Sequence, residues 1–581
     1  MTSRVNPLVS DRFVEFLLND VLDVEGLFAF PAYRELSRET LDLWLSSCRR
    51  VAREVFYPSY RAIDAEPPQL IDGAVKVHPK LRDAWKAMVE LEVIDGSRTL
   101  PLTLTTLSSA YLMAGNLSAY GYAGLTTGAV HLIESFGSDD VKARFVEKMR
   151  KGEWTGTMAL TEPHAGSSLA DVTTRARRST GEHFLLDGAK IFISGGDHDL
   201  ADNVVHLVLA RIEGAPAGTK GLSLFAVPKR RLENGALVNN DVHVTGLIHK
   251  IGWKGLPSLA LAFGEEGDCR GWLVGNPNEG LRCMFQMMNE ARIMVGVNAT
   301  ATASVAFHES IHWANERPQG RPLGVSDVKS PQVPLVQHPD VRRMLLRQKA
   351  IVEGSLALLA MTSRWSDEAH HQVDDEKRAS AKLLLDLLTP IAKTFPAEKG
   401  FESNALALQL HGGYGYSSEY APEAWLRDQK LNTIHEGTTG IQGLDLLGRK
   451  VVAGGGAALA RLMEEVSADL SKSALEAGEL QAGFDELAGA VATLGARGLE
   501  GNVEGMLGHS ADFMEGMSTL VIAWVWVRLV NALGARDDDF AKGLRAAAQY
   551  WLVTEVAKAR ASIAVATSEE RSFMDLRPSW L

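Results

Sequence analysis

Residues 409–416 read QLHGGYGY, and residues 434–442 read IHEGTTGIQ. The glycines in both stretches permit a ligand to approach the backbone closely. In the second stretch, Glu436 follows an apolar, helix-like run and directly precedes Gly437. A carboxylate that is partly buried there would have a raised pKa and would suit a catalytic base, whereas a carboxylate at a solvated helix end would not. The stretch alone leaves both interpretations open.

The regions around these two stretches have apolar residues at helical spacing. We expect long helices over 284–317, 341–366 and 375–396, and further helices from 459 to about 563 after a glycine linker at 454–456. Residues 1 to about 155 also predict helices, one of them capped by Ser138. The apolar segment 519–533 is shorter than the roughly 20 residues of a membrane-spanning helix, so it predicts a buried core helix.

A region with a different sequence pattern separates the helical regions. From 156 to about 275 the chain consists of short β-like runs broken by turn residues. Asp187-Gly188 lies between two such runs and predicts a hairpin. The chain is therefore expected to be mainly α-helical with a middle β-domain. We expect four domains, at 1–156, 157–277, 278–453 and 457–581.

Composition excludes several classes of protein. The 581 residues carry 60 Lys and Arg against 72 Asp and Glu, a net charge of −12, which is unfavourable for a nucleic-acid surface. The three cysteines, Cys48, Cys269 and Cys283, are interpreted as reduced thiols. No secretory signal is visible at the N-terminus, so a cytoplasmic location is expected.

Two segments of the β-region have ligand-binding character. Residues 158–168 read MALTEPHAGSS, a turn rich in hydroxyls and backbone N–H groups that either binds a polar ring edge or a phosphate or is an ordinary surface turn. Residues 190–196 read KIFISGG. Phe192 and Ser194 are two apart and share a strand face, so they either wall a flat ring and hydrogen-bond to it or belong to the core.

One metal motif is present but incomplete. Residues 308–312 read HESIH, which matches the H-E-x-x-H pattern of zinc proteases. No third-ligand motif follows it, so a helix surface with two incidental histidines is the favoured interpretation. No metal site is expected.

Together, the three segments at 158–168, 190–196 and 409–442 resemble the acyl-CoA dehydrogenase family in content, order and spacing. The resemblance covers about residues 100–450. The N-terminal opening and the region after the glycine linker are similar to the longer bacterial members, which include 3-methylthiopropionyl-CoA dehydrogenases. The resemblance implies a helical domain, a middle β-barrel and a four-helix bundle, followed here by an additional helical domain.

The resemblance also implies FAD as cofactor, placed between barrel and bundle, and assigns its contacts. The residues at the family's flavin positions are Thr161, Ser167, Phe192, Ser194 and Thr438. Those that match contacts to the FAD of a neighbouring subunit are Arg317, Gln409 and Gly413, which implies a homodimer or a dimer of dimers. The positions that match substrate contacts are Arg292, Ser167 and Gly437.

Glu436 matches the family's catalytic base. The implied reaction removes the α-proton of an acyl-CoA thioester while the β-hydride passes to the flavin, giving a trans-2-enoyl-CoA as in β-oxidation. Electrons would leave through an electron-transferring flavoprotein. Some members carry the base beside the bundle arginine instead, but that position is Ala291 here. Phe192 replaces the usual Trp, and His435 replaces the usual Tyr.

Three alternatives remain at this point. An acyl-CoA oxidase has the same base chemistry and would produce peroxide. A non-catalytic DNA-binding flavoprotein would need a basic patch in 457–581, where the sequence has an acidic run at 537–539. The apolar stretch 521–530, with Trp524 and Trp526, would either pack in its own core, as we expect, or dock on a membrane or a partner. The acyl chain is not predicted.

Overall fold

The computed structural model describes residues 6–581, apart from the side chains of Ser97 and of residues 285–289. The chain divides into two compact units, and the boundary falls within three helices. The barrel unit consists of Asp42–Leu100 and Tyr111–Ala291. The helical unit consists of the described part of Met1–Leu41 together with Pro101–Ala110 and Arg292–Leu581.

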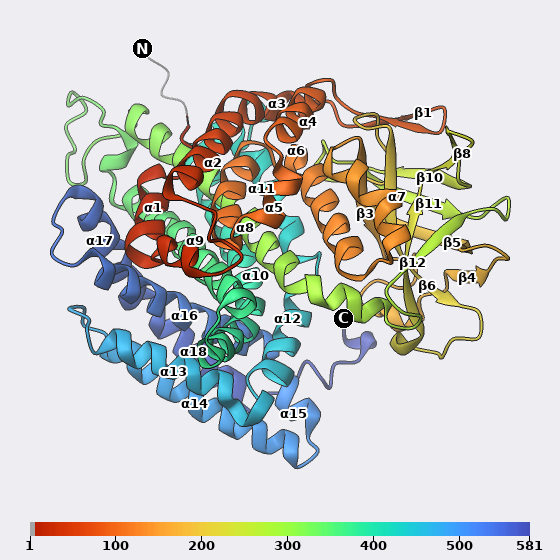
Figure 1. Ribbon diagram of the computed structural model, residues 1–581. Helices are drawn as coiled ribbons and strands as arrows, with labels where there is room; N and C mark the ends of the chain where they lie inside the picture. The colour runs from red at the N-terminus through yellow and green to blue at the C-terminus, as the bar shows by residue number, and fades with distance from the viewer. Residues whose placement is uncertain (1–5) are drawn as a thin grey trace. The chain divides into compact units, whose positions relative to one another are not determined.

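The barrel unit contains a closed five-stranded barrel, as the sequence predicted (Figure 1). Its strands pair in the order β4-β5-β12-β7-β6 and back to β4. Their bounds are β4 (Arg175–Arg178), β5 (Phe184–Ser194), β6 (Asn203–Ile212), β7 (Leu222–Pro228) and β12 (Arg270–Val274). Strand β3 (Trp154–Ala159) runs parallel to β6, and β11 (Ser258–Phe263) with β10 (Val242–Ile248) extends the sheet from β5. Two small hairpins complete the set: β1 (Gln69–Ile71) with β2 (Ala74–Lys76), and β8 (Arg230–Glu233) with β9 (Ala236–Asn239).

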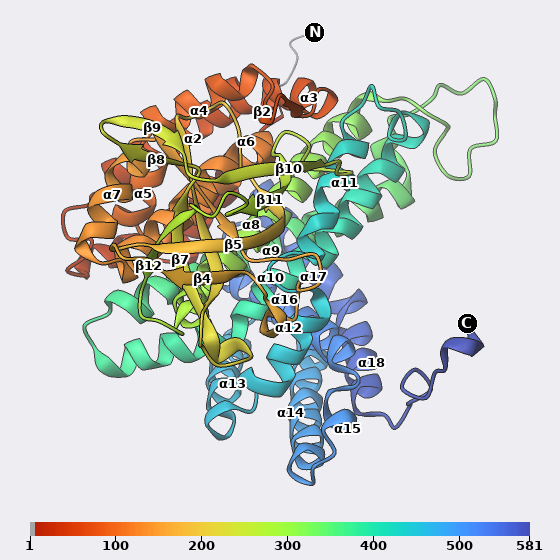
Figure 2. The same ribbon diagram turned by 90° about the vertical axis from the view of Figure 1, so that its right-hand side faces the viewer.

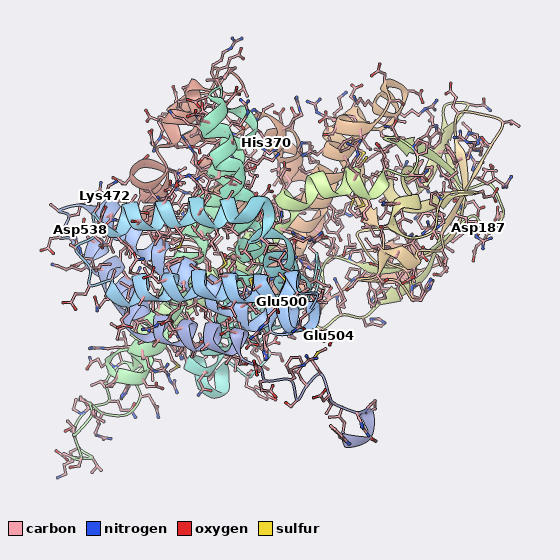
Figure 3. All side chains as sticks on the ribbon, turned by 90° about the horizontal axis from the view of Figure 1, so that it is seen from below. Asp187, His370, Lys472, Glu500, Glu504 and Asp538 are labelled. Carbon is pink, nitrogen blue, oxygen red and sulfur yellow. The ribbon has the colours of Figure 1, made fainter. Side chains whose placement is uncertain are left out.

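The hairpin predicted at Asp187-Gly188 is wrong. Strand β5 runs straight through both residues, and Figure 3 labels Asp187 on it. The strand changes partner here: Asp187 pairs with Arg175 of β4, and Gly188 pairs with Phe263 of β11. A Cβ on Gly188 would lie 2.5 Å from Oγ1 of Thr174. The glycine is therefore needed for close packing inside the barrel rather than for a turn.

Strand β5 is irregular near its end. Leu259 of β11 pairs with Ile193 and Leu261 pairs with Lys190, so β5 has one extra residue between these pairs. This is a β-bulge, and within it Phe192 has a left-handed φ of 61°. Ile193 stays in the core, whereas the side chain of Phe192 is 60% exposed. The simple alternation of faces expected for Phe192 and Ser194 is interrupted by this bulge.

The helices associated with the barrel unit precede β3. They are α2 (Arg38–Val51), α3 (Tyr57–Ala65), α4 (Lys80–Glu90), α5 (Val93–Thr99), α6 (Leu102–Phe136) and α7 (Asp139–Arg150). The predicted cap at Ser138 is confirmed, because its side chain accepts a hydrogen bond from the backbone N–H of Val141. Helix α6 is interrupted at Asn116, whose backbone is extended.

The helical unit is built on three long helices, as the periodicity predicted. These are α8 (Gly280–Glu316), which begins in the barrel unit, α9 (Pro339–His371) and α10 (Asp375–His411). Helix α10 does not end at Pro396, where the sequence pattern stopped, but continues through both Pro390 and Pro396. Both prolines are buried, and tight packing holds the helix where local preference would break it. Shorter helices are α1 (Asp11–Phe16), α11 (Pro422–Lys430) and α12 (Thr439–Asp445).

Six further helices follow the turn at Ala453–Gly456 (Figure 2). They are α13 (Ala457–Leu470), α14 (Gly478–Leu499), α15 (Val503–Leu507), α16 (Ser510–Leu533), α17 (Asp539–Thr554) and α18 (Val556–Thr567). Figure 3 labels Lys472 and Asp538 at one end of this helical array and Glu500 and Glu504 at the other.

Helix α16 is the core of the C-terminal helices. The segment Val503–Leu533 is long and apolar enough to cross a membrane, but 83% of its apolar window is buried inside the protein. Trp524 and Trp526 are fully buried, and their indole N–H groups donate to Asp469 and to the carbonyl of Ala350. The expectation of a core helix is confirmed.

All three cysteines are free and buried. Burial raises the pKa of the Cys269 thiol far above its usual range, and burial also raises the pKa of Cys283. The thiolate form is therefore scarce at both positions.

Candidate active site

Glu436 lies in a turn of the helical unit, not at the end of a helix. The apolar run before Glu436 forms only a short 3₁₀ turn at Leu431–Thr433, and α12 begins three residues after Glu436, at Thr439. Glu436 and Gly437 both have left-handed backbones, with φ of 53° and 90°. Glycine is favoured at position 437, because a φ of 90° is a backbone conformation that residues with a side chain rarely adopt.

Two neighbouring helices hold this turn in place. From α12, Nε2 of Gln442 donates to the carbonyl of Glu436 at 2.9 Å. From α10, Nζ of Lys393 donates to the carbonyl of Gly437 at 2.8 Å. Among the described residues, the backbone N–H groups of Glu436 and Gly437 have no acceptor. Two donors therefore stay available beside the carboxylate.

The Glu436 carboxylate itself receives no hydrogen bond from the part of the chain that the structure describes. Solvent reaches the side chain, yet protein atoms surround it densely enough to desolvate the charge. This burial raises the pKa of Glu436, against the opposing positive charges of Arg292 and Lys393. A carboxylate with a raised pKa and no fixed donor is suited to take up a proton.

Arg292 is buried beside this turn, with 5% of its surface exposed. Its Nη1 forms an ion pair with Asp445 of α12 at 2.7 Å, and Asp445 also pairs with Arg449 at 2.8 Å. The Nε of Arg292 has no partner among the described residues. The structure thus places Arg292 close enough to affect Glu436, while its contact with CoA stays a prediction.

Lys393 was not identified from the sequence. It is fully buried on α10, between the two prolines. Burial lowers its pKa to about 8, although the negative charges of Glu398 and Glu436 oppose that shift. Glu398 in turn accepts a hydrogen bond from Thr439, at the start of α12. Nothing in the local sequence distinguishes Lys393 from a surface lysine.

Thr438 caps α12. Its hydroxyl accepts a hydrogen bond from the backbone N–H of Ile441. The cap orients the helix start directly after the Glu436 turn. The contact of Thr438 with a flavin stays a prediction.

Arg317, Gln409 and Gly413 all lie in the helical unit. The guanidinium carbon of Arg317 lies 5.2 Å from the centroid of the Tyr414 ring. Tyr414 directly follows Gly413 in the chain, so this contact brings Arg317 close to Gly413. Gln409 and Gly413 are exposed, and no atom lies within 4 Å of a Cβ placed on Gly413. These groups remain accessible on the surface of this chain.

In the barrel unit, Glu162 organises the loop that follows β3. Its carboxylate accepts hydrogen bonds from the backbone and hydroxyl groups of Thr173 and Thr174 and pairs with Nζ of Lys190 at 2.9 Å. Lys190 also donates to the carbonyl of Leu160. Burial opposes the charge on Glu162, but Lys190 and these hydrogen bonds lower its pKa to about 2. The network fixes both ends of the loop 160–174.

The predicted flavin contacts of the barrel unit lie on this loop and on β5. Thr161 is half-buried, and its carbonyl accepts from the backbone N–H of Ile191, which ties the loop to the bulge in β5. Ser167 is exposed, and a Cβ on the adjacent Gly166 would meet open space. Ser194 is half-buried, and its carbonyl accepts from the hydroxyl of Thr157.

The surroundings of Phe192 fit a flat ring with polar edges. A largely exposed aromatic side chain on a left-handed backbone is costly unless a ligand covers it. The hydroxyls of Thr161, Ser167 and Ser194 supply hydrogen-bonding groups in the same unit. This donor set is of the kind that an isoalloxazine ring requires.

Family models match three parts of the chain. The middle domain of acyl-CoA dehydrogenases matches residues 157–265, the C-terminal domain of acyl-CoA dehydrogenases matches 278–451, and an acetyl-CoA dehydrogenase C-terminal-like domain matches 460–577. The 3-methylmercaptopropionyl-CoA dehydrogenase of Ruegeria pomeroyi is 36% identical to this chain, over 79% of each protein.

Solved structures share the fold. ACDH-11 of Caenorhabditis elegans in complex with C11-CoA aligns with a TM-score of 0.74 and 19% identity, covering 98% of this chain and 96% of its own. An acyl-CoA dehydrogenase from Bacillus anthracis complexed with FAD aligns with a TM-score of 0.72 and 19% identity, covering 97% and 94%.

Proposed function

This chain belongs to the acyl-CoA dehydrogenase family, and on that premise we propose that it converts an acyl-CoA thioester to the trans-2-enoyl-CoA with Glu436 as base. It is an oxidoreductase that acts on acyl-CoA, and its cofactor is FAD. The observation that carries the proposal is the Glu436 carboxylate. Glu436 is exposed to solvent, but the surrounding protein atoms raise the pKa of its carboxylate, which lies close enough to Arg292 and Lys393 to feel their charges and has no hydrogen-bond donor among the described residues.

The α-proton of a thioester is only weakly acidic, so the base must be positioned and the developing negative charge must be stabilised. The left-handed turn fixes the direction of the Glu436 side chain, and Lys393 and Gln442 hold that turn. The available N–H groups of Glu436 and Gly437 would donate to the thioester carbonyl, which makes the α-carbon more acidic. Arg292 and Lys393 keep a share of Glu436 ionised and ready to accept the proton.

The residues present fit FAD. When bound, FAD supplies the acceptor for the hydride that leaves the β-carbon. In the barrel unit, Phe192 would cover the ring face, and Thr161, Ser167 and Ser194 would bond its polar groups. In the helical unit, Thr438 would contact FAD. Arg317, Gln409 and Gly413 would hold the FAD of a second subunit, in a homodimer or a dimer of dimers.

Several further properties follow from the same proposal. We infer four domains, at 1–156, 157–277, 278–453 and 457–581, and a cytoplasmic enzyme with reduced cysteines. An electron-transferring flavoprotein would take the electrons. The name of the Ruegeria pomeroyi relative supports a short, linear acyl group, with 3-methylthiopropionyl-CoA as the first substrate to test.

An anaerobic titration of the purified holoenzyme tests the proposal. A panel of 3-methylthiopropionyl-, butyryl-, octanoyl- and isobutyryl-CoA is added while the flavin absorbance is followed. We expect stoichiometric bleaching by the short linear thioesters and formation of the enoyl-CoA product. A flavin that stays oxidised with the whole panel contradicts the proposed activity.

Admitting air after the reduction tests the acceptor. We expect air to reoxidise the flavin slowly and without peroxide. An added electron-transferring flavoprotein should reoxidise it fast. Rapid peroxide formation with each turnover would instead identify an acyl-CoA oxidase.

A further inference from the structure

The barrel unit has a pocket that the proposed reaction does not use. It has a volume of about 410 Å³, within the size range of small-molecule sites. Its walls come from α7, which packs against β3 and β12, and from the hairpin strand β8 and the chain before β5. Figure 2 shows α7, β8 and β12 in this part of the barrel unit. None of the residues assigned to FAD or to the acyl-CoA lines it.

Five cations line this pocket, and only one carboxylate, Glu182, lines it with them. The cations are Arg144, Lys148, Arg230, Arg231 and Arg270. Three of the arginines already have carboxylate partners: Arg144 pairs with Asp140 at 2.6 Å and with Glu182 at 3.6 Å, and Arg231 and Arg270 pair with Asp268 and Glu233. These pairs fix the guanidinium groups and leave the other two cations without acidic partners.

Lys148 and Arg230 have no ion-pair partner within the described part of the chain. Lys148 lies over the ring of Trp154, with 4.6 Å from Nζ to the centroid. The two residues come from different elements, α7 and β8, so they present two positive groups to one space. Burial lowers the pKa of His183 in the same wall, and the charges of Arg270, Arg231 and Arg144 lower it further, against the opposing charge of Asp268.

Aromatic side chains form the remaining wall. Phe145 packs edge-on against Trp272, with centroids 5.7 Å apart, and also contacts Trp154 at 6.3 Å. The ring of His183 lies 6.1 Å from that of Trp272. Trp154 and Phe145 are buried, whereas Trp272 is only half-buried and lines the pocket, with the guanidinium carbon of Arg144 5.3 Å from its ring centroid. A planar ligand ring would stack on it.

We propose that this pocket binds a nucleotide, that is, a phosphate ester attached to a planar base. A phosphate monoester carries a charge of about −1.5 to −2 at pH 7, which matches the two unpaired cations, and arginine is well suited to its oxygens. Base stacking on an aromatic side chain adds affinity and depends little on which base is present. The same chemistry is found in a free nucleotide and in the adenosine 3′,5′-bisphosphate half of CoA.

Isothermal titration calorimetry of the FAD-loaded enzyme tests this site without any activity measurement. AMP, 3′,5′-ADP, adenosine and inorganic phosphate are the probes. We expect saturable binding of at least one nucleotide, and at least tenfold weaker binding of adenosine and of phosphate. The double variant Lys148→Ala/Arg230→Ala should weaken the nucleotide roughly a hundredfold, about tenfold for each charge-assisted contact removed.

Two further variants locate the ligand. Lys142→Ala removes a cation from the same helix outside the pocket and should leave binding unchanged. Trp272→Leu should weaken the nucleotide about tenfold and leave weak phosphate binding as it was. Thermal unfolding of each variant should match the wild type, so that lost binding is not lost folding.

Competition with butyryl-CoA distinguishes the two sources of the nucleotide. If saturating acyl-CoA prevents 3′,5′-ADP from binding to the wild type, the pocket holds the nucleotide half of CoA. If both bind together, the ligand is a free nucleotide. Two results overturn the proposal: no saturable heat with either nucleotide at millimolar concentration, or nucleotide binding that the double variant leaves intact.

Discussion

Each unit contains a glutamate close to a buried lysine, and the two glutamates differ sharply. In the barrel unit, the Glu162 carboxylate accepts bonds from two threonines and Lys190, and its pKa falls to about 2. In the helical unit, Lys393 donates to the carbonyl of Gly437 instead of the Glu436 carboxylate, and the pKa of Glu436 rises. Burial lowers the pKa of each lysine to about 8.

The difference lies in where the hydrogen bonds go. Burial disfavours a carboxylate charge in both places, and at Glu162 the charge of Lys190, together with direct hydrogen-bond donors, outweighs that effect. Glu162 has its donors and is fixed as an anion that holds a loop. Glu436 has none among the described residues and is left able to gain and lose a proton. The same pair of residue types thus gives a structural ion pair in one unit and a candidate base in the other.

Removing the proton-accepting carboxylate of Glu436 should have the largest effect. Glu436→Gln should retain FAD but lower turnover by a factor of roughly 10²–10⁴ or more. The rate of flavin bleaching in anaerobic single-turnover experiments measures this loss of turnover. Glu423→Gln, which changes a carboxylate already paired with Arg427 on α11, is the control and should remain active. Near-normal bleaching in Glu436→Gln would place the base elsewhere.

The structural pair should respond in stability instead. Glu162→Leu leaves Lys190 buried without its counter-charge, which should cost about 3–5 kcal/mol in the free energy of unfolding. Urea unfolding followed by circular dichroism measures the loss. The double variant Glu162→Leu/Lys190→Met removes both charges and should regain most of it. A single variant as stable as the wild type would mean that the ion pair contributes nothing.

Substitution of Lys393 tests whether this lysine lowers the pKa of Glu436. Its positive charge lowers the pKa of Glu436, so Lys393→Met should raise that pKa. Because the base must be ionised, activity is lost as pH falls through this pKa, and the acid limb of kcat/KM should move to higher pH. A coupling of about 1.4 kcal/mol would reduce turnover about tenfold near that limb. Lys393→Arg should restore the limb, and an unshifted profile in Lys393→Met would exclude the coupling.

The smallest effect concerns the pH dependence of folding, which should have opposite signs at the two glutamates. The low pKa of Glu162 stabilises the fold above about pH 4.5, and that contribution is lost as pH falls toward 2. The raised pKa of Glu436 instead costs stability as pH rises above about 4.5 through the folded pKa. Glu436→Gln should therefore be more stable than the wild type at neutral pH, by at most about 1 kcal/mol because solvent reaches the carboxylate. Thermal unfolding from pH 4 to 8 would show the gap opening with pH; a gap that closes instead would contradict the assignment.

Local sequence patterns predicted much of the fold. Apolar periodicity placed α8, α9 and the start of α10, and short β-like runs placed β6, β7 and β11. Two failures have one cause, which is tertiary packing that overrides a local signal. Asp187-Gly188 stays in a strand because β4 and β11 pair on either side of it, and α10 continues through Pro390 and Pro396 because its neighbours pack around it.

The candidate site was predictable only in part. Glu436, Gly437 and Phe192 stand in short, recognisable motifs. Glu162 and Lys190 were also in those motifs, but they are 28 positions apart, and only the closed barrel makes them a pair. Lys393 lies 44 positions before Gly437, so its contact depends on how α10 packs against the turn. Separations of this length carry no local signal in one sequence.

The burial of Cys48, Cys269 and Cys283 has a practical consequence for spectroscopy. With no native thiol at the surface, a maleimide dye should react slowly with the wild-type protein. A cysteine introduced at an exposed helix end, such as Glu500→Cys after α14, would then be the one fast-reacting group. The chain thus allows single-site fluorescent labelling without prior removal of its own cysteines.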